Sequence, residues 1–130
     1  MIIILDTDIM IDVLRGYSPA LKWLDSLAGE EIVIPGFVVM ELIQGCRNRS
    51  EQEKLEGFLV GFEVAWPSPE ICDAALRVFA RFRLSHGIGI LDSLIGQLSV
   101  SLNGCLYTFN QKHYSGIPGI MTNQPYVKDY

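Results

Sequence analysis

The chain has 130 residues, of which 49% are hydrophobic, and it carries a formal net charge of −5. This length predicts one domain, residues 1–130, with a core of its own, and the acidic balance argues against a protein that grips nucleic acid over its whole surface. No apolar stretch approaches the roughly 20 residues of a membrane span. Asp6 interrupts the apolar start, which predicts a strand and not a signal peptide. Three cysteines without metal-binding spacing indicate thiols in a reducing cytoplasm.

The first part of the chain alternates between strand and helix signals. Residues 2–5 are predicted to form a buried strand, after which Asp8 can cap a short helix that Gly16 ends. Ser18 is predicted as the N-cap of a second helix, with Pro19 at its first helical position. Residues 31–34 are predicted as the next strand.

The rest of the chain continues this alternation. Pro35 begins a helix, and Ser50 and Glu53 have the spacing of a capping box for another. A long helix is expected between Ser68 and Gly87. A further helix is expected with Asp92 in its first turn and Leu102 among its inward residues. The remaining strands are expected at residues 62–66 and 105–108. Together these signals predict an α/β fold with a mostly parallel central sheet and helices on both faces.

Three carboxylates occur where apolar segments run into polar ones. Asp6 closes the first strand, Glu41 lies on the helix after Pro35, and Asp92 lies in the first turn of a later helix. Open α/β sheets bind ligands beyond the carboxyl ends of their strands. Three acids that converge there repel one another unless a hard divalent cation neutralises them. The pattern predicts metal-assisted chemistry on a phosphate ester.

Simpler explanations exist for some of the acids. Asp8 fits a helix N-cap as well as a place in the site, and Asp12 is expected on a solvated helix face. Asp92 alone is also explained as a helix-start acid that the helix dipole favours. Glu41 is the more telling residue, because its helix is largely apolar and unpaired glutamates are rarely buried.

Four segments together resemble the PIN-domain family, specifically the VapC-type toxin ribonucleases of bacterial and archaeal type II toxin–antitoxin pairs. Each segment alone is weakly specific, and their order and spacing over nearly the whole chain carry the resemblance. They are Leu5-Asp-Thr-Asp-Ile-Met-Ile-Asp12, Val38-Val-Met-Glu-Leu-Ile-Gln-Gly45, Leu91-Asp-Ser-Leu-Ile-Gly96 and Tyr107-Thr-Phe-Asn-Gln-Lys-His-Tyr-Ser-Gly-Ile-Pro-Gly119. The resemblance implies a three-layer α/β/α sandwich.

The resemblance also implies a site. Asp6, Glu41 and Asp92 would be the catalytic acids that hold Mg²⁺ or Mn²⁺, and Thr7 and Asn110 would lend them polar support. Oxygen ligands suit these ions, and the chain lacks the nitrogen and sulfur set that zinc prefers.

Two positions depart from the family pattern. Asp8 stands where the family often has asparagine, and His113 stands where many members have an aspartate. The set of four acids is therefore complete only if Asp8 compensates. If His113 lines the site, it could accept a hydrogen bond from a metal-bound water or, when protonated, contact RNA phosphate.

The implied activity is hydrolysis of RNA phosphodiester bonds, with transfer RNA as the family-level substrate. A cognate VapB-type antitoxin is the expected partner, because one of its arginines could enter the acidic centre and displace the metal. The hydrophobic content and the mean hydropathy of +0.27 predict a homodimer through the helices around residues 38–46 and 75–82. No membrane partner is expected, and the expected location is the cytoplasm.

Other functions compete with this interpretation. Asp6-x-Asp8 after an apolar strand also opens phosphatases of the haloacid-dehalogenase type. That family expects threonine or valine where Met10 stands, and a late paired-acid motif that this chain lacks. A receiver domain would need adjacent acids after the first strand, which are also absent. The remaining alternative is a PIN-fold binding module with weak or no catalysis, for which His113 is the best argument.

Overall fold

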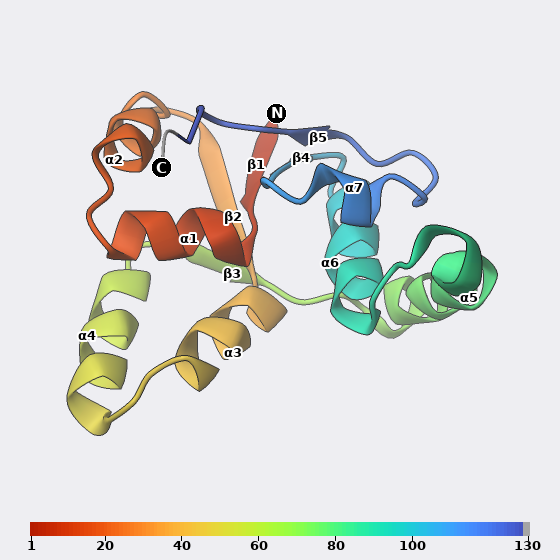
Figure 1. The fold of residues 1–130 in the computed structure, drawn as a ribbon, viewed down its shortest axis with the longest axis horizontal. Coiled ribbons are helices and arrows are strands. Elements are labelled where there is room, and N and C mark those ends of the chain that lie inside the picture. Colours follow the sequence, from red (N-terminus) through yellow and green to blue (C-terminus); the bar gives the residue numbers. More distant parts are fainter. Residues whose placement is uncertain (129–130) are drawn as a thin grey trace.

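Five strands form one parallel sheet in the order β3-β2-β1-β4-β5, so β1 lies at its centre (Figure 1). The structure is a computed structural model, which describes residues 1–128. The strands are β1 (Ile2–Leu5), β2 (Glu31–Pro35), β3 (Glu63–Ala65), β4 (Cys105–Tyr107) and β5 (Thr122–Asn123). In the pairing of β1 with β4, Leu5 lies opposite Tyr107. The residues that follow these two strands therefore emerge side by side.

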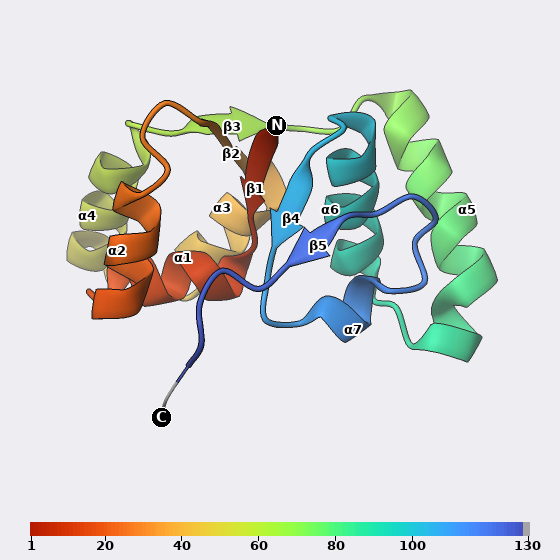
Figure 2. The same cartoon turned by 90° about the horizontal axis from the view of Figure 1, so that it is seen from above.

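Helices cover both faces of the sheet. They are α1 (Thr7–Leu14), α2 (Ser18–Asp25), α3 (Gly36–Gln44), α4 (Arg49–Leu59), α5 (Pro69–His86), α6 (Ile90–Ser101) and α7 (Gln111–Tyr114). Figure 2 shows α1 to α4 on one side of the sheet and α5 and α6 on the other. The chain moves outward from β1 to β3 and then returns to β4, so right-handed crossovers place the two groups on opposite faces. The predicted three-layer α/β/α sandwich is confirmed.

The central strands are buried on both faces. Ile4, Leu5, Ile34 and Leu106 each have an exposed fraction of 0%. Parallel strands covered by helices on both sides need continuous apolar runs rather than an alternating pattern. The first polar residue after the run in β1, Asp6, therefore appears at the carboxyl edge of the sheet.

The starts of α2 and α4 differ from the sequence prediction. Tyr17, not Ser18, is the N-cap of α2, and its side chain makes no capping hydrogen bond, so Ser18 is the first residue of the helix. Asn48, not Ser50, is the N-cap of α4, and its side chain accepts a hydrogen bond from the backbone N–H of Glu51 at 2.9 Å. The Glu51 carboxylate accepts the backbone N–H of Arg47 at 2.9 Å and pairs with the Arg47 guanidinium. Asn48 and Glu51 have the same spacing as the predicted capping-box pair, Ser50 and Glu53. The cap forms at Asn48 rather than at Ser50, and its partner Glu51 also forms an ion pair with Arg47.

Two short elements near the C-terminal end were not predicted. The helix α7 has four residues and β5 has two, so neither is long enough to show a hydrophobic period. In contrast, α5 begins after the N-cap Ser68 and ends at Gly87, whose φ of 65° is left-handed, as predicted. Within residues 1–128 no helix has the length and apolar character to cross a membrane.

Candidate active site

A cavity of about 220 Å³ opens at the carboxyl edge of the sheet, where β1 and β4 end. The chain leaves β1 towards one face and reaches β4 from the other, and such a switch point is where open α/β sheets bind ligands. The cavity is lined by every site residue that the sequence singled out, namely Asp6, Thr7, Asp8, Glu41, Asp92, Asn110 and His113. Tyr114 also lines it and was not predicted.

Asp6 is a buried carboxylate, 6% exposed, whose oxygens already accept several hydrogen bonds. Its Oδ1 accepts the backbone N–H of Thr7 at 2.8 Å, which makes Asp6 rather than Asp8 the N-cap of α1. Its Oδ2 accepts the hydroxyls of Thr108 and Tyr114, both at 2.9 Å. Burial raises the pKa of Asp6, while these hydrogen bonds act in the opposite direction.

Asp8 faces the same cavity and fastens α1 to the loop after β4. Its Oδ2 accepts the backbone N–H of Phe109 at 2.8 Å and the side-chain amide of Asn110 at 3.3 Å. Its Oδ1 accepts the backbone N–H of Ile9 at 2.9 Å. Burial, followed by the nearby charge of Asp6, raises the pKa of Asp8. Asp8 therefore adds negative charge to the cavity, although both of its oxygens already accept hydrogen bonds from other residues of the protein.

Two helices bring the other acids to the cavity. Glu41 lies on α3, and its Oε1 accepts the Thr7 hydroxyl at 2.9 Å. Asp92 is the third residue of α6, and its Oδ2 accepts the backbone N–H of Gly89 at 3.1 Å, which closes the start of that helix. Each of these carboxylates can turn towards a ligand by giving up one hydrogen bond.

The segment after β4 forms another wall of the cavity. His113 lies on α7 with its side chain exposed, close enough to line the cavity. Sequence reasoning missed Thr108 and Tyr114. The signal for Thr108 is its position directly after a strand that pairs in parallel with β1, which puts it opposite Asp6. No comparable local signal marks Tyr114.

The donor chemistry of the cavity fits a hard divalent cation. Carboxylate oxygens are the ligands that Mg²⁺ and Mn²⁺ prefer, and the Asp92 charge that helps to raise the pKa of Asp6 is a repulsion that a cation relieves. Among residues 1–128, no three acids, histidines or cysteines stand close enough to clasp an ion in their present rotamers. Glu41 and Asp92 would complete a site by turning away from their present hydrogen-bond partners.

The sequence matches the PIN domain family over residues 3–115. The chain belongs to this family. No curated protein matches it in sequence. Among solved structures, this PIN domain is similar to a chain of VapBC2 from Rickettsia felis bound to a DNA fragment from their promoter. The two share 26% identity and a TM-score of 0.82 over 95% of this chain and 98% of that one.

Two further solved structures share the architecture of this PIN domain. A chain of VapBC-1 from nontypeable Haemophilus influenzae is 26% identical with a TM-score of 0.77, covering 95% of this chain and 98% of that one. A chain of DNA-bound VapBC from Salmonella typhimurium is 21% identical with a TM-score of 0.79 and the same coverage of 95% and 98%, and it supports the fold. The resemblance predicted from the four sequence segments is confirmed.

One acid of the PIN domain lies elsewhere than predicted. Asp12 is 4% exposed instead of solvated. Its Oδ2 accepts the Tyr126 hydroxyl at 2.7 Å and pairs with Lys128 Nζ at 3.1 Å. The Lys128 ammonium also lies 4.2 Å from the centre of the Phe109 ring. The C-terminal segment thus covers this side of α1, a contact that the local pattern around Asp12 cannot reveal.

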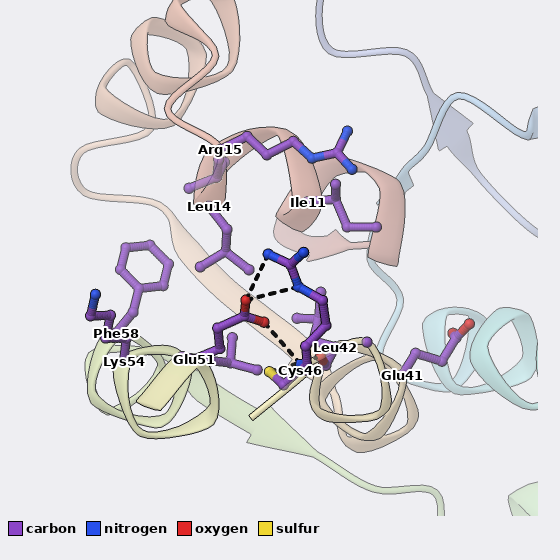
Figure 3. A pocket seen from close by; sticks show the side chains of 13 residues that line it. Ile11, Leu14, Arg15, Glu41, Leu42, Cys46, Glu51, Lys54 and Phe58 are labelled. Carbon is purple, nitrogen blue, oxygen red and sulfur yellow. Dashed lines mark hydrogen bonds and ion pairs between the residues drawn. The ribbon is translucent and has the colours of Figure 1, made fainter. Parts of the chain in front are cut away.

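A second, larger cavity of about 910 Å³ forms a groove between α1, α3 and α4 (Figure 3). Its apolar lining includes Ile11, Leu14, Leu42, Leu55 and Phe58. Figure 3 shows Lys54 and Glu41 on opposite sides of this groove, with the Glu41 carboxylate pointing away from the apolar side chains. Glu41 lines both cavities, so the groove lies next to the acidic site.

Proposed function

We propose that this PIN domain is a metal-dependent endoribonuclease and the toxin of a VapBC-type toxin–antitoxin pair. The observation that carries the proposal is that Asp6, Glu41 and Asp92, from three separate elements, line one cavity at the carboxyl edge of the sheet. Membership of the PIN domain family and the similarity to chains of VapBC complexes support it. A cytoplasmic location belongs to the same proposal.

Asp6, Glu41 and Asp92 would hold Mg²⁺ or Mn²⁺. When bound, such an ion would ease the deprotonation of a water and offset charge on the phosphoryl oxygens of the substrate. Asp6 is fixed in advance by its hydrogen bonds, and Thr7 holds Glu41 in the same wall of the cavity.

Exposed residues on α7 and just before it suit an RNA backbone. Lys112 and His113 are exposed on α7, and the exposed Asn110 precedes them. A lysine attracts phosphate, and a histidine does so once it is protonated. Asp8 holds the loop that carries Asn110 against α1. Structured RNA, with transfer RNA as the leading candidate, is the proposed substrate.

The groove of α1, α3 and α4 is the proposed seat of the antitoxin. Its apolar lining suits the apolar face of a partner helix, and because Glu41 belongs to both cavities, one end of such a helix would reach the acids. An arginine there would pair with Glu41 and its neighbours in place of the cation. Arg15 and Lys54, which also line the groove, would favour acidic residues elsewhere on the same helix.

A homodimer is also part of the proposal. Large apolar side chains stay exposed on α3, α5 and α6: Met40 (58%), Leu76 (63%), Leu84 (85%) and Ile90 (65%). Apolar surface of this kind favours association with a second copy. Light scattering at micromolar concentration should give the mass of a dimer, and Leu84→Glu should shift it towards the monomer. A monomer in the unmutated protein would count against this part of the proposal.

One observation favours a second candidate, a PIN-fold binding module without activity. The acids of residues 1–128 form no ready metal clasp in their present rotamers. A module of this kind would bind RNA or the antitoxin without binding Mn²⁺.

The deciding experiment is RNA cleavage with and without metal. We expect EDTA to abolish cleavage, and Mg²⁺ or Mn²⁺ to restore it. Asp6→Asn should remove cleavage while the protein stays folded, because neutralising one carboxylate relieves repulsion in the metal-free site. Cleavage that persists in EDTA would overturn the metal-dependent mechanism, and absence of cleavage together with absence of Mn²⁺ binding would favour the binding module.

A further inference from the structure

Tyr114 places a hydroxyl on Asp6 inside the protein. The tyrosine is 1% exposed, and its hydroxyl donates to Asp6 Oδ2 at 2.9 Å. The Tyr114 ring packs closely against Gly96 of α6. Even a single β-carbon added to Gly96 would lie only 3.3 Å from Tyr114 Cδ1. Packing on both sides of this contact makes the hydroxyl a fixed donor, because neither the ring nor the carboxylate has room to move far.

The hydrogen bonds on Asp6 leave few positions for a cation. A carboxylate offers roughly two lone-pair positions on each oxygen. The hydroxyls of Tyr114 and Thr108 fill both positions on Oδ2, each at 2.9 Å. The backbone N–H of Thr7 takes one position on Oδ1 at 2.8 Å. The position left for an ion is therefore on Oδ1.

We propose that Tyr114 is a positioning residue that makes the cavity selective for Mg²⁺ or Mn²⁺ over Ca²⁺, because it keeps Asp6 Oδ2 occupied and limits Asp6 to a single contact with the ion. This inference rests on the proposed function, which assigns a divalent cation to the cavity. Mg²⁺ requires a compact, nearly octahedral shell, which one oxygen per carboxylate suits. Ca²⁺ takes more ligands at longer distances and readily binds both oxygens of one carboxylate.

A purely structural role would have a different signature. The hydroxyls of Tyr114 and Thr108 also compensate for burying the Asp6 charge. If that were their only role, losing one of them would lower the stability of the protein or weaken the binding of all cations equally. The selectivity between two ions on the same folded protein separates these roles, because a general loss cancels from the ratio of their dissociation constants.

The test is calorimetric titration of Mn²⁺ and Ca²⁺ into the metal-free protein, the Tyr114→Phe variant and a control. In Tyr114→Phe we expect Ca²⁺ to gain about tenfold relative to Mn²⁺, because the freed position on Oδ2 gives Ca²⁺ an additional oxygen contact. Tyr107→Phe is the control, since the Tyr107 hydroxyl interacts with Asn123 and Cys105 rather than with Asp6. It should leave the ratio unchanged.

Thr108 provides an independent pair of variants. Thr108→Val frees the other position on Oδ2 and should shift the ratio in the same direction, whereas Thr108→Ser keeps a hydroxyl and should not. An unchanged ratio in folded Tyr114→Phe and Thr108→Val would overturn the inference while leaving Mn²⁺ binding, and with it the proposed function, in place. Failure of the unmutated protein to bind Mn²⁺ would instead overturn the proposed function and this inference together.

Discussion

The acids around the cavity divide into two halves that the protein holds in different ways. Asp6, directly after β1, and Asp8, at the start of α1, accept hydrogen bonds from both the start of α1 and the segment after β4. Glu41 and Asp92, on α3 and α6, are held within the described residues by one hydrogen bond each. The strand half is therefore built into the fold, and the helix half is free to adjust.

This difference separates folding from ligand binding. Changes in the strand half alter both the stability of the protein and the shape of the metal site, because the same oxygens serve both. Changes in the helix half should alter metal binding and cleavage while leaving stability nearly untouched. The predictions below test this division, beginning with the largest expected effect.

Asp92→Asn should lower the rate of RNA cleavage by at least about a hundredfold, the scale of losing one preorganised electrostatic group. The asparagine oxygen can still accept the Gly89 N–H, so the melting temperature should stay close to that of the unmutated protein. Asp73→Asn, an exposed acid on α5, removes the same charge away from the cavity and serves as control. Loss of cleavage accompanied by unfolding would contradict the division.

Glu41→Gln should weaken Mn²⁺ binding by about tenfold or more, whereas Thr7→Val should weaken it by less, because the threonine only orients the glutamate. The backbone N–H of Thr7 still caps onto Asp6 in both variants. Calorimetry on the two proteins gives the comparison. A larger loss in Thr7→Val than in Glu41→Gln would show that Thr7 is more than an orienting group.

Asp8→Asn should lower the free energy of unfolding by about 1 kcal/mol, the scale of one ordinary hydrogen bond, because an amide NH₂ replaces one of the two oxygens that accept the N–H groups of Phe109 and Ile9. Chemical denaturation measures it, and Mn²⁺ binding should loosen only modestly. Asp12→Asn, one turn further along α1, should also destabilise the protein, because a neutral amide cannot form the ion pair with Lys128 and accepts the Tyr126 hydroxyl more weakly. Since Asp12 does not line the cavity, its substitution should leave Mn²⁺ affinity unchanged. A tenfold loss of Mn²⁺ affinity in Asp12→Asn would contradict the separation between the residues that stabilise α1 and those that bind the ion.

The smallest effect concerns pH. The pKa values of Asp6 and Asp8 lie above 3.8 in the metal-free fold, so protonation favours the folded state. Their contribution to stability is complete below 3.8 and is lost as the pH rises through the raised values, with a slope below about 1.4 kcal/mol per pH unit for each group. Melting temperatures across this range should show a flatter pH dependence in Asp6→Asn. If the melting temperature has the same pH dependence in Asp6→Asn and in the unmutated protein, protonation of Asp6 does not contribute to it.

The sequence predicts where the acids of the strand half lie, but not which groups donate hydrogen bonds to them. A continuous apolar run followed by Asp6 marks the end of a buried central strand, and the structure puts it there. The hydroxyls that bond it come from Thr108 and Tyr114, more than 100 residues away, with sequence separations of 102 and 108. The register between β1 and β4 brings Thr108 to Asp6, and the packing of α7 against α6 brings Tyr114 there; no local period encodes either contact.

The same limitation explains the misplaced residues. Asp12 has the spacing of a solvated helix position, but the C-terminal segment, 114 residues further along at Tyr126, covers it. Ser50 was predicted as a cap from its spacing to Glu53, but Asn48 has the same spacing to Glu51, and the contact of Glu51 with Arg47 appears only in three dimensions. Helix and strand positions follow from local patterns, whereas the partners of polar groups follow from the packed fold.

The most direct test of the account is one series of Mn²⁺ titrations, by calorimetry, into metal-free protein and into Asp6→Asn, Glu41→Gln and Asp92→Asn. If the two halves hold the same cation, the unmutated protein should show saturable binding, and each of the three substitutions should weaken it. If any one of the three variants binds Mn²⁺ with unchanged affinity, that acid lies outside the metal site, and a cation shared between the strand half and the helix half is contradicted.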